Sequence, residues 1–256
     1  MPPTTTPTDK VLSIDLSFTD CIYRIHRCTA KTNRIIYVTL KALDIIPEES
    51  QTYGPDVIRQ LSKLENWNKE WVTLTVDRDQ NGGIQSNCDA YKVHGLRAEQ
   101  VLGDYPRINI FDVGTGGLEG VKSRSFRVRQ AGNESRWFLK IARFGFEIGW
   151  LAREIEVYHL LAQRGKDLNL APKILGYVYE ETPDRVMGVI LEEVVGYRPG
   201  IEDLEVCREG LQRLHDLDIV HGDINRDNMF ITDEGVKFID FEVASVGSTL
   251  VFFISL

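Results

Sequence analysis

The segment that most constrains the fold of this chain lies near its end, where acidic and amide side chains follow a histidine at fixed spacing. Residues 221–231 read HGDINRDNMFI, and after a turn residues 238–242 read FIDFE. The short apolar runs on either side of the turn are typical of strands. We therefore expect Asp223, Asn228 and Asp240 to bring three oxygen-bearing side chains into one cleft.

These three side chains suit a divalent metal and a phosphate. Mg²⁺ prefers carboxylate, amide and phosphate oxygens, and phosphoryl transfer needs little from a protein beyond positioning and neutralisation of charge. Asp223 fits the orientation of a hydroxyl nucleophile, whereas Asn228 and Asp240 fit the binding of the metal. Taken singly, each is more often an ordinary turn residue, because Asp and Asn side chains cover turns and cap helices.

With this segment the chain resembles the protein-kinase-like superfamily, whose catalytic loop and metal-binding Asp follow in the same order. The forms HGD and IDFE are similar to those of the branch that contains aminoglycoside phosphotransferases, choline kinases and fungal phosphotransferase-like proteins. That branch mostly phosphorylates small-molecule hydroxyls. The resemblance covers residues 108–245 and implies ATP and Mg²⁺ as cofactors.

Two upstream residues fall where the resemblance requires them. Residues 137–142 (WFLKIA) are similar to the superfamily's third strand, which implies that Lys140 contacts the α and β phosphates. Glu154 lies on a helix expected over residues 149–163 and would pair with Lys140. A lone lysine in a strand is usually a solvated charge, but its place in this order favours the functional interpretation.

The remaining nucleotide-binding residues have the weakest sequence signal. The strand expected at 186–191 resembles the one that leads into the interlobe hinge, where backbone groups of Glu192 and Val194 would meet adenine. A glycine-dense stretch would approach the phosphates, with Gly114, Gly116 and Gly117 as backbone contacts and Ser123 beyond them. Its spacing does not reproduce GxGxxG, and a plain hairpin turn explains it equally well.

The resemblance implies an α+β, protein-kinase-like fold with a β-rich N-terminal lobe, a hinge and a helical C-terminal lobe. We expect a disordered Pro/Thr-rich tail at 1–10, an additional α/β segment of unknown role at 11–95, the N-terminal lobe at 108–191 and a partial C-terminal lobe at 192–256. Because sixteen residues follow Asp240, the C-terminal lobe is expected to be truncated. A helix expected at 201–217 would then leave apolar surface exposed.

Periodicity predicts the individual elements. In the N-terminal segment we expect strands at 11–18, 21–28, 34–40 and 71–76, a helix over 54–65, and a turn-rich stretch at 77–87. In the kinase-like part we expect strands at 108–113, 125–130 and 137–143, followed by the helix and the hinge strand already named.

Composition narrows the partners and the compartment. The net charge of −8 argues against a nucleic-acid partner, which would require a basic surface. The four cysteines form no CxxC pair, and no apolar run follows a basic stretch at the start, so we expect a cytoplasmic protein. The apolar end at 250–256 is too short for a membrane helix, which needs about 20 residues.

Three functions remain open. The first is an ATP- and Mg²⁺-dependent phosphotransferase that acts on a hydroxyl, with a small molecule as acceptor. The second is a catalytically impaired nucleotide-binding or scaffold protein, which the short C-terminal lobe favours, with a protein partner bound through the N-terminal segment. The third is a protein serine/threonine kinase. Against the third stand Gly222 in place of the usual arginine, Glu242 in place of the usual glycine, and the lack of an APE-like segment.

Overall fold

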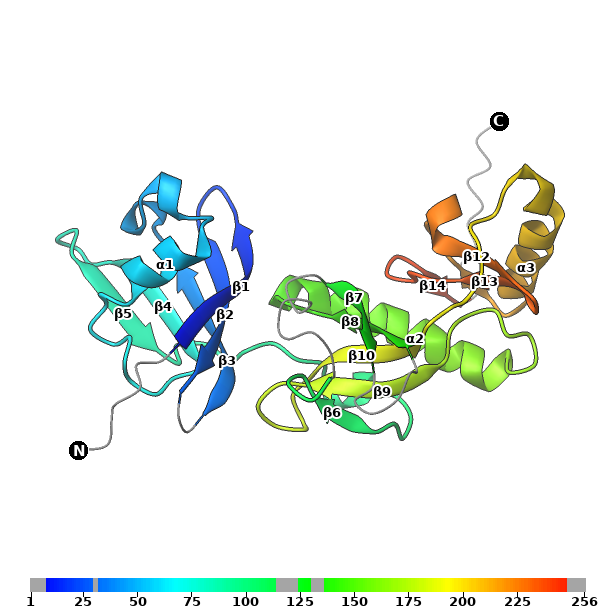
Figure 1. Ribbon diagram of the computed structural model, residues 1–256, viewed down its shortest axis with the longest axis horizontal. Helices are drawn as coiled ribbons and strands as arrows, with labels where there is room; N and C mark the ends of the chain where they lie inside the picture. Colours follow the sequence, from blue (N-terminus) through cyan, green and yellow to red (C-terminus); the bar gives the residue numbers. More distant parts are fainter. Residues whose placement is uncertain (1–7, 30–31, 114–123, 130–135, 248–256) are drawn as a thin grey trace.

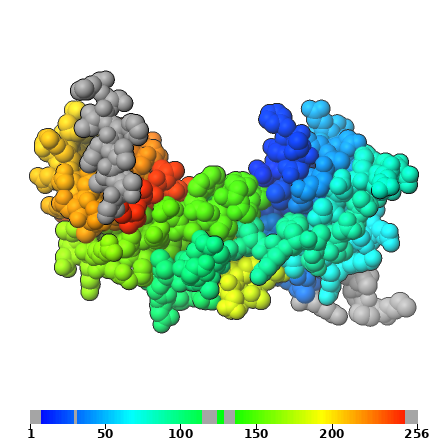
Figure 2. All heavy atoms as spheres, turned by 180° about the vertical axis from the view of Figure 1, so that it is seen from behind, coloured from blue at the N-terminus to red at the C-terminus, as the bar shows by residue number. Residues whose placement is uncertain are grey.

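A computed structural model describes residues 8–29, 32–113, 124–129 and 136–247. Figure 1 shows three parts in a row: a first sheet with helix α1, a second sheet with helix α2, and a third part with helix α3 and two small sheets. Figure 2, seen from behind, places the N-terminal residues at one end and the C-terminal residues at the other, with residues of the second sheet between them.

The first part, which we call the N-terminal module, is a five-stranded sheet in the order β1-β2-β3-β4-β5. Its strands are β1 (Thr8–Leu16), β2 (Cys21–Cys28), β3 (Asn33–Leu40), β4 (Thr73–Arg78) and β5 (Ile84–Cys88). All neighbours are antiparallel except β3 and β4, which are parallel. A parallel pair needs a crossover, and α1 (Gly54–Leu61) lies in it, with Val57 and Leu61 buried against the sheet.

The second sheet has the order β6-β9-β10-β8-β7. Its strands are β6 (Arg107–Asn109), β7 (Ser125–Arg129), β8 (Arg136–Ile141), β9 (Ile174–Tyr179) and β10 (Val186–Glu192). Helix α2 (Ile148–Arg164) connects β8 to β9. It buries a stripe that includes Leu151, Ile155 and Tyr158, as expected from their spacing of three and four residues.

The third part follows β10 and is small. It contains α3 (Leu204–Asp216), a hairpin of β12 (Met229–Thr232) and β13 (Gly235–Phe238), and the short pair of β11 (Ile219–Val220) and β14 (Ser245–Val246). The chain is therefore α+β, as expected. The apolar exposure predicted for the helix region is present, because Ile201 and Leu204 are both exposed.

The two large sheets pack face to face, and β3 shows this most clearly. Alternate residues of a strand point to opposite faces. Ile36 and Val38 of β3 belong to the apolar core beneath α1. Ile35 and Tyr37 belong instead to a second apolar cluster that the N-terminal module shares with β8, β9 and β10. Strand β3 is thus buried on both faces.

Most of the predicted elements are confirmed, but several differ. The strand expected at 108–113 is short, because β6 spans Arg107–Asn109 and a turn follows it. Strand β1 begins at Thr8, so residues 8–10 belong to the sheet and the expected tail at 1–10 is too long. Strand β5 lies in the stretch predicted as turns, because an exposed edge strand needs no apolar alternation. Strand β9 had no prediction. Within the described residues, no helix combines the length and the apolar character that crossing a membrane would require.

Candidate functional site

Lys140 on β8 lies at the centre of a group of carboxylates. Its Nζ is 2.8 Å from both carboxylate oxygens of Glu154 on α2 and 2.8 Å from Oδ1 of Asp240. Burial alone would lower the pKa of Lys140, but the charges of Glu154 and Asp240 outweigh it and raise the pKa. The site therefore holds a permanent ammonium group. The fold brings Lys140 and Asp240 together although they are 100 residues apart in the sequence.

Glu154 is fully buried, and a second donor helps to hold it. The hydroxyl of Tyr158, one turn further along α2, donates to Glu154 Oε1 at 2.8 Å. Burial raises the pKa of Glu154, and the charge of Lys140 offsets this in part. A buried carboxylate with two donors is a fixed anchor, so Glu154 orients Lys140 while Asp240, which is partly exposed, faces the cleft.

Glu242 adds a third carboxylate to this group. Its Oε1 lies 3.4 Å from Lys140 Nζ and 2.5 Å from Arg124, at the start of β7. One carboxylate oxygen each of Glu154, Asp240 and Glu242 lie within 4.8 Å of one another. A cavity of about 130 Å³ opens on these residues. Oxygen donors of this kind suit Mg²⁺. Glu154 is buried and held by Lys140, so Asp240 and Glu242, which are partly exposed, are the two carboxylates that fit the metal.

Asp223 lies on the exposed loop after β11, and two amides fix its carboxylate. Asn228 Nδ2 donates to Asp223 Oδ2 at 2.9 Å and to its backbone oxygen at 3.0 Å. Asn225 Nδ2 donates to Asp223 Oδ1 at 3.2 Å. The backbone N–H of Ile239 donates to the carbonyl of Asn228, which holds this loop against the residue preceding Asp240.

His221 helps to hold the loop that carries Asp223. It is buried beside Phe238 and Phe241, and burial lowers its pKa, so the ring is neutral. Its Nε2 lies 2.9 Å from the carbonyl of Ile239, and its Nδ1 lies 3.3 Å from the N–H of Asp223. With the proton assigned to Nε2, both contacts are hydrogen bonds, and the ring has no proton left to exchange with a substrate.

Gly222 shows why this loop has the form HGD. Its φ is +82°, and a Cβ would lie 2.5 Å from the carbonyl oxygen of Val243. We expect Gly222→Ala to lower the free energy of unfolding by about 2 kcal/mol or more, because both the backbone strain and the contact oppose the side chain. Urea unfolding monitored by circular dichroism measures this.

Gly149→Ala is the matched control for that variant. Gly149 lies on α2, and a Cβ there would meet no atom within 4 Å. Replacing a helical glycine by alanine is expected to raise stability by up to about 1 kcal/mol. Equal stability of the two variants would contradict the account of Gly222.

The expected hinge residues line a second cavity, of about 120 Å³. Glu192 and Val194 lie on one side of it, with Phe138 and Lys140 on β8 and Phe230 on β12 among the others. The N–H of Glu192 donates to the carbonyl of Lys173 and so is already used. The side-chain Oε2 of Glu192 is buried without a hydrogen-bond partner among the described residues. An unpartnered acceptor in a largely apolar cavity is suited to a base with an amino group.

Four of the predicted nucleotide-binding residues have no geometry to compare. Gly114, Gly116, Gly117 and Ser123 lie outside the described residues. The other predicted site residues fall into three groups: Lys140, Glu154 and Asp240 meet at one point, Asp223 and Asn228 meet at another, and the expected hinge residues form the third. Glu192 and Val194 line the cavity that also reaches Lys140.

Sequence reasoning missed several residues of the site. Glu242 was noted only as a replacement for glycine, although it lies two residues from Asp240 in the same acidic segment. Phe230 and Arg198 were missed because apolar and basic residues carry no specific signal; the Arg198 guanidinium carbon lies 3.8 Å from the centre of the Phe230 ring. Tyr158 could have been found from its spacing of four residues from Glu154.

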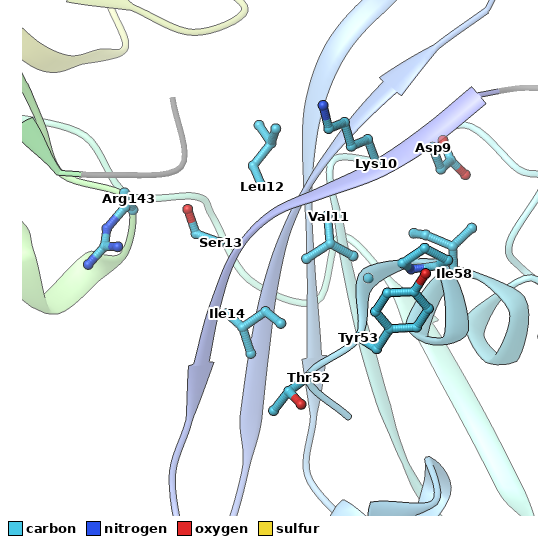
Figure 3. Close-up of a pocket in the computed structure, with 12 residues that line it drawn as sticks. Asp9, Lys10, Val11, Leu12, Ser13, Ile14, Thr52, Tyr53, Ile58 and Arg143 are labelled. Carbon is cyan, nitrogen blue, oxygen red and sulfur yellow. The ribbon is translucent and has the colours of Figure 1, made fainter. Parts of the chain in front are cut away.

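A larger cavity lies elsewhere, along β1. It measures about 830 Å³ and is lined by six successive residues of β1, by the start of α1 and by Arg143 (Figure 3). The acidic residue there, Asp9, is already paired with Arg27 at 3.0 Å. This cavity has no convergent carboxylates and no equivalent of Lys140, so its chemistry differs from that of the cleft.

Comparison with known proteins gives two partial similarities. No family model matches the chain. It is similar to the KEOPS complex subunit Bud32 of Pyrococcus abyssi, with 41% identity over 68 residues, or 25% of this chain and 31% of that protein. It is also similar to a probable bifunctional tRNA threonylcarbamoyladenosine biosynthesis protein of Methanothermobacter thermautotrophicus, with 41% identity over 58 residues, or 21% of this chain and 11% of that protein.

The matched stretch spans less than a third of each of these two relatives. The sheet that carries Lys140, the helix that carries Glu154 and the loop that carries Asp223 have the order and the arrangement expected from the resemblance. The chain therefore has a protein-kinase-like fold, and its similarity to the two relatives supports a place in the protein-kinase-like superfamily.

Proposed function

We propose that this protein is an ATP- and Mg²⁺-dependent phosphotransferase that transfers the γ-phosphate to the hydroxyl of a small molecule. The observation that carries the proposal is the meeting of Lys140, Glu154 and Asp240 at 2.8 Å beside a cavity lined by the hinge residues. A buried ammonium fixed on both sides supplies the charge that triphosphate oxygens need, at little cost of reorganisation.

Each residue of the site would then have its own role. Lys140, held by Glu154, would bind the α and β phosphates. Asp223, whose two carboxylate oxygens accept from Asn228 and Asn225, would orient the acceptor hydroxyl and accept its proton. The exposure of Asp223 leaves room for that acceptor. Glu192 and Val194 would contact adenine, and Gly114, Gly116, Gly117 and Ser123 would cover the phosphates.

Asp240 and Asn228 would hold Mg²⁺, and Glu242 would add a further oxygen ligand. When bound, Mg²⁺ supplies neutralisation of the phosphate charge. The partial exposure of the Asp240 side chain, next to Lys140, supports this role.

A first test is stabilisation by nucleotide. We expect saturating Mg²⁺-ATP to stabilise the wild-type chain by about 2.7 kcal/mol at a hundred times its dissociation constant, because a ligand that binds only the folded state stabilises it. Lys140→Ala should lose most of this increment, measured against its own ligand-free state by thermal unfolding. Lys166→Ala, which removes an exposed lysine just after α2, should keep it. No increment in the wild type would overturn the proposal.

The identity of the phosphate acceptor distinguishes the proposed phosphotransferase from a protein kinase and from a nucleotide-binding or scaffold protein. Transfer of labelled γ-phosphate would be followed with amino alcohols, aminoglycosides, sugars and a generic protein substrate. Labelling of a small molecule supports the proposal and its finer form, membership of the aminoglycoside phosphotransferase and choline kinase branch, which rests on the forms HGD and IDFE. Labelling of protein alone would make the chain a protein kinase. Binding without any transfer would make it a nucleotide-binding or scaffold protein.

A protein partner is a further part of the proposal, because one relative is named as a subunit of a complex. We place the partner on the N-terminal module, and the chain in the cytoplasm. Sedimentation of the purified chain, mixed with a purified candidate partner of defined sequence, would test this part. If no candidate partner sediments with the chain, the proposal of a protein partner is overturned.

A further inference from the structure

The strand that carries Lys140 is covered on its other face by the N-terminal module. Leu139 and Ile141 are the immediate neighbours of Lys140 on β8, and they point away from the cleft. Both belong to the apolar cluster that contains Ile35 and Tyr37 of β3. The position of Lys140 therefore depends on a surface to which residues far away in the sequence contribute.

A buried network of charges joins the same two sheets. At its centre is Glu180, directly after β9, whose carboxylate is bonded to Arg24 of β2, accepts from the hydroxyl of Tyr37 at 2.8 Å and pairs with Arg185 at 2.9 Å. The side chains of Arg24 and Glu180 are both 0% exposed. Such a network has strict geometry, so it fixes how the module sits on the second sheet.

A second path leads from the module to the end of β8. The ring of Tyr37 meets the ring of His94 edge-on at 5.2 Å, and His94 Nε2 lies 3.0 Å from the carbonyl oxygen of Ala142. Ala142 is two residues beyond Lys140, and its N–H donates to Met187 on β10 at 2.8 Å. His94 is half-buried, and its bond to Ala142 is partly buried as well.

We propose that Tyr37 and His94 are positioning residues for Lys140, and that the N-terminal module acts as a fixed backing for β8 that sets where the Lys140 ammonium meets the nucleotide phosphates. This inference rests on the proposed function, since it assumes that Lys140 binds ATP. Neither residue touches the cleft. Both act through the backbone at the end of β8 and through the apolar face of Leu139 and Ile141.

The test compares binding of Mg²⁺-ATP with binding of adenosine, by isothermal titration calorimetry on the full chain. A residue that acts through Lys140 affects the phosphates and leaves the base contacts unchanged. We expect His94→Leu to weaken ATP about fivefold and adenosine not at all. Tyr37→Phe keeps the ring packing, loses the bond to Glu180, and should show a smaller loss in the same direction.

Three controls make the result specific. His94→Gln restores a donor to the Ala142 carbonyl and should recover ATP binding. Arg59→Ala, on the exposed face of α1, should change neither ligand. His94→Leu should have no further effect in a chain that already carries Lys140→Ala, because residues that act through one group are not additive.

Each other outcome overturns a definite statement. A wild type that binds adenosine and ATP equally, or neither, overturns the proposed function. A wild type that prefers ATP, with His94→Leu and Tyr37→Phe unchanged, overturns the positioning role alone. Equal weakening of ATP and adenosine in the variants also overturns it, because that result indicates a general loss of structure. If His94→Leu does not fold, Tyr37→Phe and His94→Gln decide the question.

Discussion

Asp223→Asn is expected to lower the turnover of ATP by about a hundredfold or more, because the variant lacks the carboxylate that we propose orients and deprotonates the acceptor. General-base groups contribute on the order of 10² to 10⁴ in rate. The amide has the same shape as the carboxylate, and its oxygen would still accept from Asn228. Binding of Mg²⁺-ATP, measured by the stabilisation it gives, should therefore change much less than turnover.

The measurement is release or transfer of labelled γ-phosphate, with the acceptor panel and with water alone. Asp233→Asn is the matched control, because Asp233 is an exposed acidic residue in the turn between β12 and β13. Turnover of Asp223→Asn equal to that of this control would show that Asp223 has no part in the chemistry. Turnover lost in both would point instead to damage to the hairpin.

The second large effect concerns stability. Glu180→Gln should lower the free energy of unfolding by about 3–5 kcal/mol, because it leaves the buried guanidinium group of Arg24 without a counter-charge and that of Arg185 with only Glu181, at 3.8 Å. Glu181→Gln is the control one residue away. Its partner Arg34 is 2.8 Å distant but both side chains are partly exposed, so about 1 kcal/mol or less is expected.

The pH dependence of stability distinguishes these two variants further. Burial would raise the pKa of Glu180, but the charges of Arg24 and Arg185 and the bond from Tyr37 outweigh it and lower the pKa from 4.5 to about 2. The folded state therefore binds this proton less readily than the unfolded state. Stability from Glu180 is complete above about pH 4.5 and is lost as the pH falls towards about 2, by about 3 kcal/mol in total.

Urea unfolding between pH 7 and pH 3 tests this directly. The wild type and Glu181→Gln should lose stability over that acid range, whereas Glu180→Gln starts lower and should change less with pH. A Glu180→Gln variant with the full acid dependence of the wild type would show that other carboxylates carry the effect.

The Asp223–Asn228 pair could be predicted from sequence because the two residues are five positions apart on one loop. Asp240, which was expected in the same cleft, is bonded instead to Lys140. Lys140 and Glu154 could be placed only through the resemblance, since a strand lysine and a helix glutamate have no specific signal of their own. Glu242 was seen in the sequence, but its ion pairs with Lys140 and Arg124 depend on tertiary packing.

The packing of the N-terminal module against the second sheet could not be predicted from the sequence. The run of β-branched and aromatic residues at 34–40 predicted a strand, and the apolar residues at 35–38 fill both of its faces, which is more than a sheet with one solvated face needs. That excess was a signal for a second packing surface. Nothing in the sequence indicated that Arg24 and Glu180 would meet, because two single charges 156 residues apart have no pattern.

This separation has a consequence for the order in which the chain folds. During synthesis, β2 and β3 emerge long before Glu180 and before the strands that cover Ile35 and Tyr37. Tyr37 and Glu180, for example, are 143 residues apart in the sequence. The module can form its core with α1 early, but its second apolar face stays open until β10 has been made. Contacts of such long range slow folding and expose apolar surface in the meantime. The nascent chain therefore passes through a stage in which the face that later supports Lys140 is the one most exposed to aggregation or to a chaperone.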